Sequence, residues 1–476
     1  MKKITSVPLL LVLLSGCGNN MDRRMLQSDC SFLGDVSDTT RLVCGSIRVP
    51  ENHDKPDGRQ ISIAYVILKS EDSDTEQYPM IYFTGGPGGQ ALLNVQGQLD
   101  NPILKTRDII RFDQRGIGKS SPLPDLTSKL YGLFPEDLTS DEERERIGRL
   151  VRELRQTCDE EGIEIEMYNT FQNARDVGML MDHLGYDKYN LRGGSYGTRI
   201  ARVVADYFPE RIHTAIYDSP APHRNDYLLT RLEDYSVSLR KVLDYCQAVP
   251  ECNEQYPDLE AAYFEVLDRL SREPVEAEFA GRPFVLNPQD AIFFLRYELY
   301  KNDSRSLVPK FIAALRTEDL DWINQVIDSR GMSTSNYAMF LACENYEEYD
   351  HGITSEVVAQ KYGELELLPY ELPIFTSLYL NSSDFLKSYA SKEMKEYRVS
   401  DIPSLIFINQ FDPVTPPENA AIFQSKMIDS RAFVIDEGGH GGGDMECKRK
   451  IMDAFMTSPD VELDTKCLKL YEEGTA

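Results

Sequence analysis

Short apolar runs recur in the first half of the chain and again near its end. Most are followed by glycine- or proline-rich turns and then by helical patterns. Short apolar runs bounded by turns are typical of buried strands. The runs are residues 61–68, 80–83, 109–112, 189–191, 214–217, 405–408 and 432–435. Because these strands alternate with helical patterns, the chain is predicted to have an α/β fold with a mainly parallel sheet.

Two helical patterns have clear boundary signals. The segment Ser140-Asp141-Glu142-Glu143 has the form of a capping box and predicts the start of a helix. Behind it, apolar residues recur at helical spacing. Residues 173–184 predict a second helix, which ends at Gly185.

Between Pro222 and about Pro373 the pattern changes. Strands become scarce, and acidic helical patterns rich in tyrosine and leucine dominate. Examples are residues 228–246, 259–270 and 308–314. The strand pattern then returns, which two independent domains would not explain. We therefore predict an α/β core in two parts, residues 29–221 and 374–476, with a helical cap of residues 222–373 inserted between them.

The first residues form a targeting signal. Lys2 and Lys3 precede an apolar stretch, residues 7–14, that is far below the ~20 residues needed to span a bilayer. Leu14-Ser15-Gly16-Cys17 then resembles a bacterial lipoprotein signal, with cleavage and lipidation at Cys17. We expect a signal peptide of residues 1–16, a tether of residues 17–28, and a protein held by its lipid in the bacterial cell envelope, in the periplasm or at the cell surface. The alternative is an ordinary signal peptide with a chance cysteine.

The cysteines fit that compartment. The chain has 9, and an even number remains when Cys17 is set aside. An even number in an oxidising compartment suggests disulfides throughout. Proximity favours three pairs and leaves a fourth: Cys30–Cys44, Cys246–Cys252, Cys447–Cys467 and Cys158–Cys343. A zinc site is the alternative, but no CxxC or HxxxH spacing is present, so no metal or cofactor is expected.

The net charge of the chain limits the classes of partner that it can bind. The formal net charge is −27, from 51 basic and 78 acidic residues. Nucleic acid and anionic bilayers would repel such a surface, so membrane contact is expected only through the lipid anchor. With 41% hydrophobic residues, the chain can bury a large core.

A candidate nucleophile stands between a predicted strand and a predicted helix. Gly193-Gly194-Ser195-Tyr196-Gly197 is a G-x-S-x-G segment. Such a turn pushes the serine Oγ out of the sheet, and side chains at 193 and 197 would collide with neighbouring backbone. It also turns the Tyr196 N–H toward the same space.

A glycine-rich loop follows the strand of residues 80–83. In Thr84-Gly85-Gly86-Pro87-Gly88-Gly89 the backbone can approach a bound oxygen, and Gly86 is the preferred donor because Pro87 has no N–H. Gly86 and Tyr196 amides are therefore predicted to form an oxyanion hole. A phosphate loop is the alternative, but it would need a Gly-Lys-Ser/Thr sequence before a helix.

The strand of residues 109–112 leads into Asp113-Gln114-Arg115-Gly116. Gly118-Lys119-Ser120 superficially matches the end of a P-loop, but the upstream glycine is replaced by Asp113. We expect Asp113 and Arg115 to support the site through hydrogen bonds.

Asp412 and His440 complete a predicted catalytic triad. Each stands in a loop after one of the last predicted strands, and His440 has glycines on both sides. A serine needs an imidazole to take its proton, and the imidazole needs a carboxylate to orient it. The order Ser195, Asp412, His440 is that of α/β hydrolases.

Together, these segments resemble the proline iminopeptidase and tripeptidyl aminopeptidase group of α/β hydrolases, over roughly residues 40–455. The resemblance implies a serine exopeptidase with an α/β-hydrolase fold, a helical cap and no cofactor. It also implies peptide substrates with a free N-terminus. Thr84 stands where proline iminopeptidases usually carry histidine, which favours the secreted, tripeptidyl-aminopeptidase-like branch.

In that group, acids near the cap bind the substrate α-amino group. Glu344 is the first candidate here, because a disulfide at Cys343 would hold it in place, and Glu347 and Glu348 follow. A protonated amine entering a pocket of low dielectric needs such a carboxylate. The alternatives are a solvated acidic helix face, a carboxylesterase or lipase on the same fold, and a non-catalytic surface binding protein.

Overall fold

The computed structural model describes residues 29–471 except residues 35, 37, 73 and 332, and it contains an 8-stranded sheet in the order β1-β2-β4-β3-β5-β6-β9-β10. The strands are β1 (Leu42–Pro50), β2 (Gln60–Leu68), β3 (Met80–Phe83), β4 (Ile109–Phe112), β5 (Tyr189–Gly194), β6 (Ile212–Asp218), β9 (Ser404–Asn409) and β10 (Ser430–Ile435). β2 pairs antiparallel with β1 and β4, and all other neighbours are parallel. The predicted α/β fold with a mainly parallel sheet is confirmed.

Strand β1 is the core strand that the apolar pattern did not predict. Its sequence contains Gly45, Ser46 and Arg48, which weaken the apolar pattern. The strand forms because it pairs along its whole length with β2, from Leu42 opposite Leu68 onward. Gly45 lies against the Tyr65 ring, where a Cβ atom would approach the hydroxyl to 2.5 Å.

Both faces of the sheet are covered, which explains why an inner strand such as β9 is buried at every position. Alternate residues of β2 enter two separate hydrophobic clusters, with Tyr65 in one and Val66 in the other. Helices α3 (Thr170–Leu184) and α4 (Tyr196–Tyr207) belong to the first cluster, and α17 (Met445–Thr457) belongs to the second. Helix α16 (Pro417–Gln424) follows β9.

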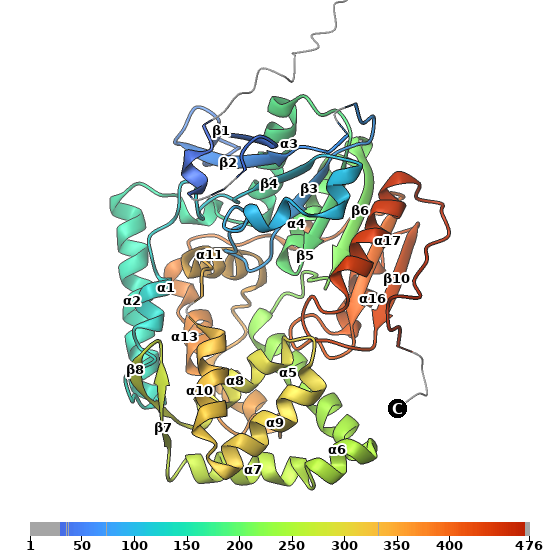
Figure 1. Ribbon diagram of the computed structural model, residues 1–476. Coiled ribbons are helices and arrows are strands. Elements are labelled where there is room, and N and C mark those ends of the chain that lie inside the picture. Colours follow the sequence, from blue (N-terminus) through green and yellow to red (C-terminus); the bar gives the residue numbers. More distant parts are fainter. Residues whose placement is uncertain (1–28, 35, 37, 73, 332, 472–476) are drawn as a thin grey trace, which may run out of the picture.

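A long, mainly helical segment separates β6 from β9, and helices α1 (Thr127–Tyr131) and α2 (Ser140–Glu160) lie between β4 and α3. Figure 1 shows most of the inserted helices below the sheet. The insert contains α5 (Tyr227–Ala248), α6 (Pro250–Gln255), α7 (Leu259–Leu270), β7 (Val275–Phe279), β8 (Arg282–Leu286), α8 (Pro288–Leu299), α9 (Ser304–Thr317), α10 (Leu320–Arg330), α11 (Tyr337–Glu348), α12 (Ser355–Glu364), α13 (Pro373–Leu380), α14 (Ser382–Phe385) and α15 (Lys392–Lys395). The β7–β8 hairpin was not predicted. That residues 222–373 act as a separate cap stays a prediction.

The predicted capping box is wrong by one residue. Thr139 is the N-cap of α2, and its hydroxyl accepts from the Glu142 N–H while the Glu142 carboxylate accepts from the Thr139 N–H. Glu142 is exposed and free to reach back. Glu143 is instead half-buried, and burial followed by the nearby Glu371 raises its pKa to about 7.

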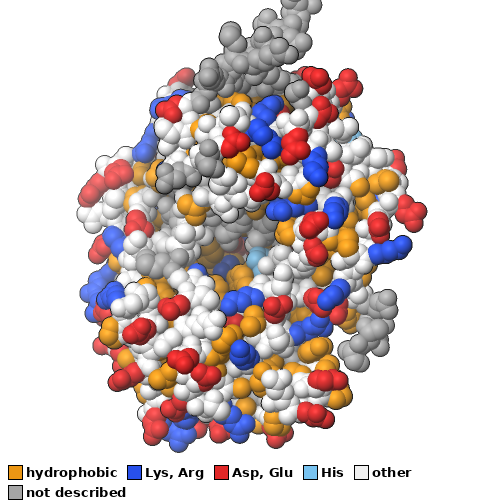
Figure 2. All heavy atoms as spheres, in the orientation of Figure 1, with side chains coloured by type: hydrophobic (Ala, Val, Ile, Leu, Met, Phe, Trp, Pro, Cys, Tyr) orange, Lys and Arg blue, Asp and Glu red, His pale blue; other side chains and the backbone are white. Residues whose placement is uncertain are grey.

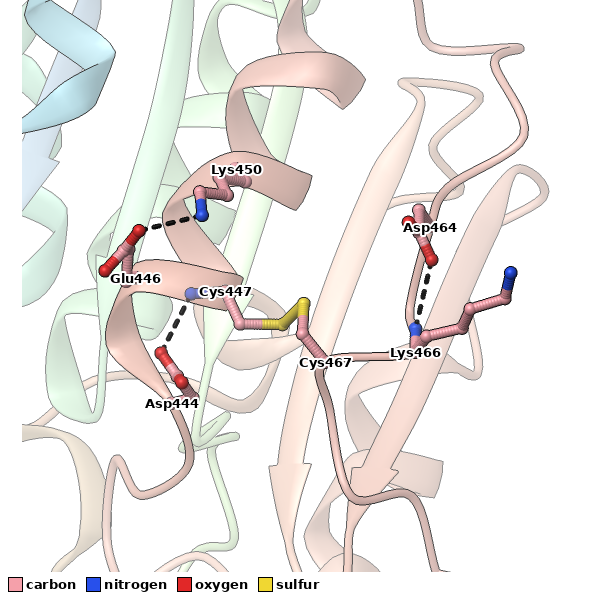
Figure 3. The surroundings of a disulfide bond; sticks show 7 residues. All are labelled: Asp444, Glu446, Cys447, Lys450, Asp464, Lys466 and Cys467. Carbon is pink, nitrogen blue, oxygen red and sulfur yellow. Dashed lines mark hydrogen bonds and ion pairs between the residues drawn. A yellow bond between two sulfur atoms is a disulfide. The ribbon is translucent and has the colours of Figure 1, made fainter.

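Three of the predicted disulfides are confirmed. They are Cys30–Cys44, Cys246–Cys252 and Cys447–Cys467. Figure 3 shows the last of these, which ties the first turn of α17 to the C-terminal segment. Asp444 caps the same turn by accepting from the Cys447 N–H at 2.9 Å.

The predicted Cys158–Cys343 disulfide is wrong. Both residues are buried free thiols, on α2 and α11 respectively. Cys158 packs in the apolar cluster, and burial raises its pKa to about 12. The Cys343 Sγ lies 3.0 Å from the Tyr196 hydroxyl and 3.1 Å from the Glu347 carboxylate, and its single S–H can donate to one of them. Each thiol therefore has its own packing role.

The predicted signal peptide, tether and lipidated Cys17 lie outside the described residues. Among the residues that are described, no helix combines the length and the apolar character needed to cross a membrane.

Candidate active site

Ser195 lies on the sharp turn between β5 and α4, with φ 56° and ψ −130°. Its N–H donates to the Asp218 carbonyl of the neighbouring strand at 2.9 Å. A Cβ on Gly193 would lie 2.4 Å from the Gly197 carbonyl oxygen, and one on Gly197 would lie 2.1 Å from the Phe83 carbonyl oxygen. The prediction that both glycines are required by close backbone contacts is therefore confirmed.

The glycine-rich loop that follows β3 lies next to Ser195. A Cβ on Gly85 would lie 2.8 Å from the Ser195 Cβ, and Gly86 has φ 123°, a conformation that favours glycine. Gln114 holds the start of this loop by donating to the Thr84 carbonyl at 2.9 Å. Gly86 and Tyr196 line one recess with Ser195, and their role as oxyanion donors stays a prediction.

Asp412 and His440 are paired. The His440 Nδ1 lies 2.8 Å from Oδ2 and 3.0 Å from Oδ1 of Asp412. Asp412 is fully buried and also accepts from the Val414 N–H, the Thr415 N–H and the Thr415 hydroxyl. Burial opposes ionisation of Asp412, but His440 and the Thr415 hydrogen bonds outweigh it and lower its pKa to about 2. The carboxylate therefore stays charged and can orient the imidazole.

The His440 loop is anchored on both the core and the insert. Gly439 donates to the Lys301 carbonyl at 3.0 Å, and a Cβ on Gly439 would lie 1.7 Å from the Leu299 carbonyl oxygen. The Tyr300 ring lies 5.2 Å from the His440 ring, edge to face. Because these contacts come from the end of α8, the insert helps to position the imidazole.

Asp113 and Arg115 have different positions. Asp113 is buried and accepts from the Leu92 and Lys119 N–H groups at 3.0 and 2.9 Å, so it joins two loops beside the site. Burial raises its pKa despite these hydrogen bonds. Arg115 forms a two-bond ion pair with Asp176 of α3 at 2.8 and 2.7 Å. Its contacts stabilise the core away from Ser195.

Two cavities meet at Ser195, between the sheet and the inserted helices. The larger has a volume of about 370 Å³ and is also lined by His440. The smaller, which we call the acidic recess after Glu344 and Glu348, has a volume of about 60 Å³. Its other charged lining residues are Asp234, Arg199, Arg224 and Arg231. Figure 2 shows the molecular surface hollowed between its upper and lower halves.

The acidic recess brings Glu344 to Ser195, but the cause differs from the one expected. No disulfide holds the helix; Arg199 of α4 does. Its Nη1 lies 3.1 Å from Glu347, 3.4 Å from Glu344 and 3.7 Å from Glu348. Arg199 was not predicted, although its place one turn after Ser195 on a buried helix was a usable signal.

The three glutamates differ in their remaining partners. Glu347 also accepts from the Thr170 N–H and lies 2.9 Å from the His223 Nε2. Burial is outweighed by these groups and by Arg199, which together lower the Glu347 pKa to about 2. Burial raises the pKa of Glu344 and of Glu348, and Arg199 offsets this only in part. Arg231 also lowers the pKa of Glu344, and the Arg224 N–H lowers that of Glu348, but neither reverses the effect of burial.

No metal centre is found in the described part of the chain, in the sense that no three His, Cys, Asp or Glu side chains are grouped to hold an ion. Ser195 and His440 line one cavity, and His440 pairs with Asp412; these are the side-chain types that nucleophilic acyl transfer requires.

Two family models match the chain. One, described as the alpha/beta hydrolase fold, matches residues 78–264. The other, described as TAP-like protein, matches residues 385–467. The first covers Ser195 and the second covers Asp412 and His440.

Three relatives have informative names. The tripeptidyl aminopeptidase of Streptomyces coelicolor is 31% identical over 188 residues, which cover 37% of this chain and 35% of that protein. The serine protease Hip1 of Mycobacterium tuberculosis is 28% identical over 188 residues, with the same coverage. Carboxylesterase B of Mycobacterium tuberculosis is 27% identical over 159 residues, 31% of this chain and 30% of that protein. The chain thus spans about a third of the length of the curated relatives it matches.

Proposed function

We propose that the chain is a serine exopeptidase that hydrolyses peptides from a free N-terminus, because family models described as the alpha/beta hydrolase fold and as TAP-like protein match residues 78–264 and 385–467. Hydrolase chemistry is supported by these two matches, and peptide substrates agree with the names of the first two relatives. The exopeptidase activity and the residues that perform it are our proposal.

The proposed mechanism uses Ser195, His440 and Asp412. The Ser195 Oγ attacks the scissile carbonyl carbon while the His440 Nε2 takes the hydroxyl proton. The Gly86 and Tyr196 N–H groups donate to the resulting oxyanion, and one such donor is typically worth about 3–4 kcal/mol of barrier. His440 then gives its proton to the leaving amine, and water releases the acyl-enzyme by the same steps.

The proposal that the substrate has a free N-terminus is based on the acidic recess. Glu344 and Glu348 are buried, line the recess beside Ser195, and share one arginine with Glu347. A substrate ammonium group would add a hydrogen-bonding cation beside two carboxyl groups whose pKa values burial raises. A volume of about 60 Å³ suits an amine and little more.

A carboxylesterase is the second candidate, because one relative has that name. A carboxylesterase does not require a pair of buried carboxyl groups next to its nucleophile. A non-catalytic binding protein is the third candidate, and it would have no use for the paired, ionised Asp412.

We propose a location outside the cytoplasm, with attachment through the lipid at Cys17. The three disulfides support the first part, since they are typical of oxidising compartments. Labelling cells with a palmitate analogue would test the second part, because wild type should be labelled and Cys17→Ala should not.

The test of function uses purified residues 18–476 and the Ser195→Ala variant as control. Free and N-acetylated versions of prolyl-, alanyl- and tripeptidyl-anilides are assayed, together with a simple ester. Serine-dependent release from free N-termini alone supports the exopeptidase. Equal or better turnover of the blocked anilides or of the ester supports the esterase. No turnover, with Ser195 unlabelled by a fluorophosphonate, supports the binding protein.

A further inference from the structure

Three arginines line the larger cavity beside Ser195: Arg231 of α5, Arg296 of α8 and Arg330 at the end of α10. We call this cavity the arginine pocket. Among the residues that the structure describes, no aspartate or glutamate lines it. The pocket therefore has a concentration of positive charge without a lining counter-charge.

Aromatic rings hold these guanidinium groups in place. Arg296 lies 5.2 Å from the Tyr300 ring centroid and 5.3 Å from that of Phe375. Arg330 lies 3.9 Å from the Tyr297 ring centroid and donates to the Tyr297 hydroxyl at 2.9 Å. Such contacts orient an arginine but leave its charge available.

Several donors of these arginines are unused. Arg296 is only 2% exposed, and its Nε and Nη2 have no hydrogen-bond partner; nor does the buried Nε of Arg330. A buried guanidinium without an anionic partner is costly to maintain. Three guanidinium groups that line one cavity without a lining acid indicate an anionic ligand, and a planar carboxylate matches the guanidinium fork.

The two cavities lie on either side of Ser195 and would hold the two parts of a bound peptide, one on each side of the scissile bond. If the ammonium group lies in the acidic recess, the acyl part of the substrate lies on that side. His440 lines the arginine pocket and not the recess. Because His440 must reach the leaving nitrogen, the segment after the scissile bond extends into the arginine pocket.

We propose that the arginine pocket binds a carboxylate on the leaving side of the scissile bond. That carboxylate is either the C-terminus of a short peptide or the acidic side chain of the residue after the bond. The inference rests on the proposed function, which fixes the direction of the peptide. The pocket volume of about 370 Å³ accommodates a few residues rather than a long chain.

The test compares matched substrates. Alanine peptides of two to five residues are assayed as free acids and as C-terminal amides, and Ala-Glu-amide is compared with Ala-Gln-amide. A buried charge-assisted contact predicts a kcat/KM at least about tenfold higher for the carboxylate member of one pair. The acid-over-amide pair reports the C-terminus, and the Glu-over-Gln pair reports the side chain.

Variants assign the preference to the pocket. In Arg330→Gln and Arg231→Gln, the ratio between carboxylate and neutral substrate should fall toward one. Arg272→Gln is the matched control, because Arg272 is 69% exposed and pairs with Asp268 on the same surface. Its ratio should equal that of wild type. Circular dichroism confirms that each variant is folded.

Other outcomes contradict the inference. Equal turnover of acid and amide and of Glu and Gln substrates would overturn it, and so would a carboxylate preference that survives both arginine variants. A preference for Glu-anilide over Gln-anilide alone would put the carboxylate on the acyl side and also overturn it.

A binding measurement separates this inference from the proposed function. In Ser195→Ala, calorimetry should show tighter binding of the acid than of the amide, whether or not wild type cleaves peptides. Anilide cleavage without this difference would overturn the inference and leave the exopeptidase intact. The difference without any peptide cleavage would support the pocket and overturn the exopeptidase.

Discussion

The acidic recess and the arginine pocket open on the same serine but differ in their carboxyl groups. Glu344 and Glu348 line the first together with three arginines, and among the described residues only arginines, and no acid, bring charge to the second; Arg231 lines both. Buried charges without full partners destabilise a protein, so packing in the core does not explain the charged side chains of either cavity. Placed on both sides of a nucleophile, they can orient a peptide by its own two charges.

The largest expected effect comes from a substitution that removes the nucleophile and leaves both charged regions in place. Ser195→Ala should lower kcat by about 10⁵- to 10⁶-fold, because the nucleophile is lost. Peptide affinity measured by calorimetry should stay within a few-fold of the wild-type KM. Residual activity near that of wild type would show that another residue is the nucleophile.

The next effect tests the acidic recess. Glu344→Gln should lower kcat/KM on free alanyl-anilide by about 10- to 100-fold, because a charged hydrogen bond becomes neutral. Glu364→Gln, on an exposed helix surface, is the control and should match wild type. An equal loss on a simple ester would mean that the substitution disturbs Ser195 rather than amine binding.

The third effect concerns stability and separates two neighbouring glutamates. The folded pKa of Glu347 is lowered from 4.5 to about 2, so its contribution is present above pH 4.5 and lost as the pH falls toward 2. That shift corresponds to about 3 kcal/mol at neutral pH. Chemical denaturation should show Glu347→Gln less stable than wild type at pH 7, with the difference shrinking below pH 4.

Glu344 should behave in the opposite way. Burial raises its folded pKa, so its contribution is largest at low pH and is lost as the pH rises through that pKa. Glu344→Gln should therefore be at least as stable as wild type at pH 7. If both variants lost stability equally at pH 7, Glu344 would be a structural residue like Glu347.

The smallest effect concerns the two free thiols. Alkylation of the unfolded, unreduced protein should modify Cys158 and Cys343, and mass spectrometry should find the three disulfide pairs intact. Cys343→Ser should change the activity only a few-fold, since serine can keep the hydrogen bonds to Tyr196 and Glu347. A recovered Cys158–Cys343 peptide would contradict the arrangement of α11.

The sequence was most informative where a local backbone geometry dictates the residue type. Gly193 and Gly197 are required because a Cβ at either position would strike neighbouring backbone. The inner parallel strands β5, β6 and β9 were predictable for a similar reason, since they are largely buried on both faces. Strand β1 was missed because its stability comes from pairing with β2.

Contacts between distant segments could not be predicted. Arg199 and Glu344 are far apart in sequence and meet only when α11 packs on α4. The arginine pocket takes its charges from three helices, and periodicity does not say which helix faces converge. The wrong disulfide has the same origin, because counting cysteines ignores where α2 and α11 lie.

The central claim is that charged groups on the two sides of Ser195 set the direction of a bound peptide. The most direct measurement is a crystal structure of the Ser195→Ala variant with a short alanine peptide. The account predicts the ammonium group within hydrogen-bond distance of Glu344 or Glu348 and the C-terminal carboxylate within that distance of Arg330, Arg296 or Arg231. A peptide bound in the reverse direction, or with neither end at these groups, would contradict it.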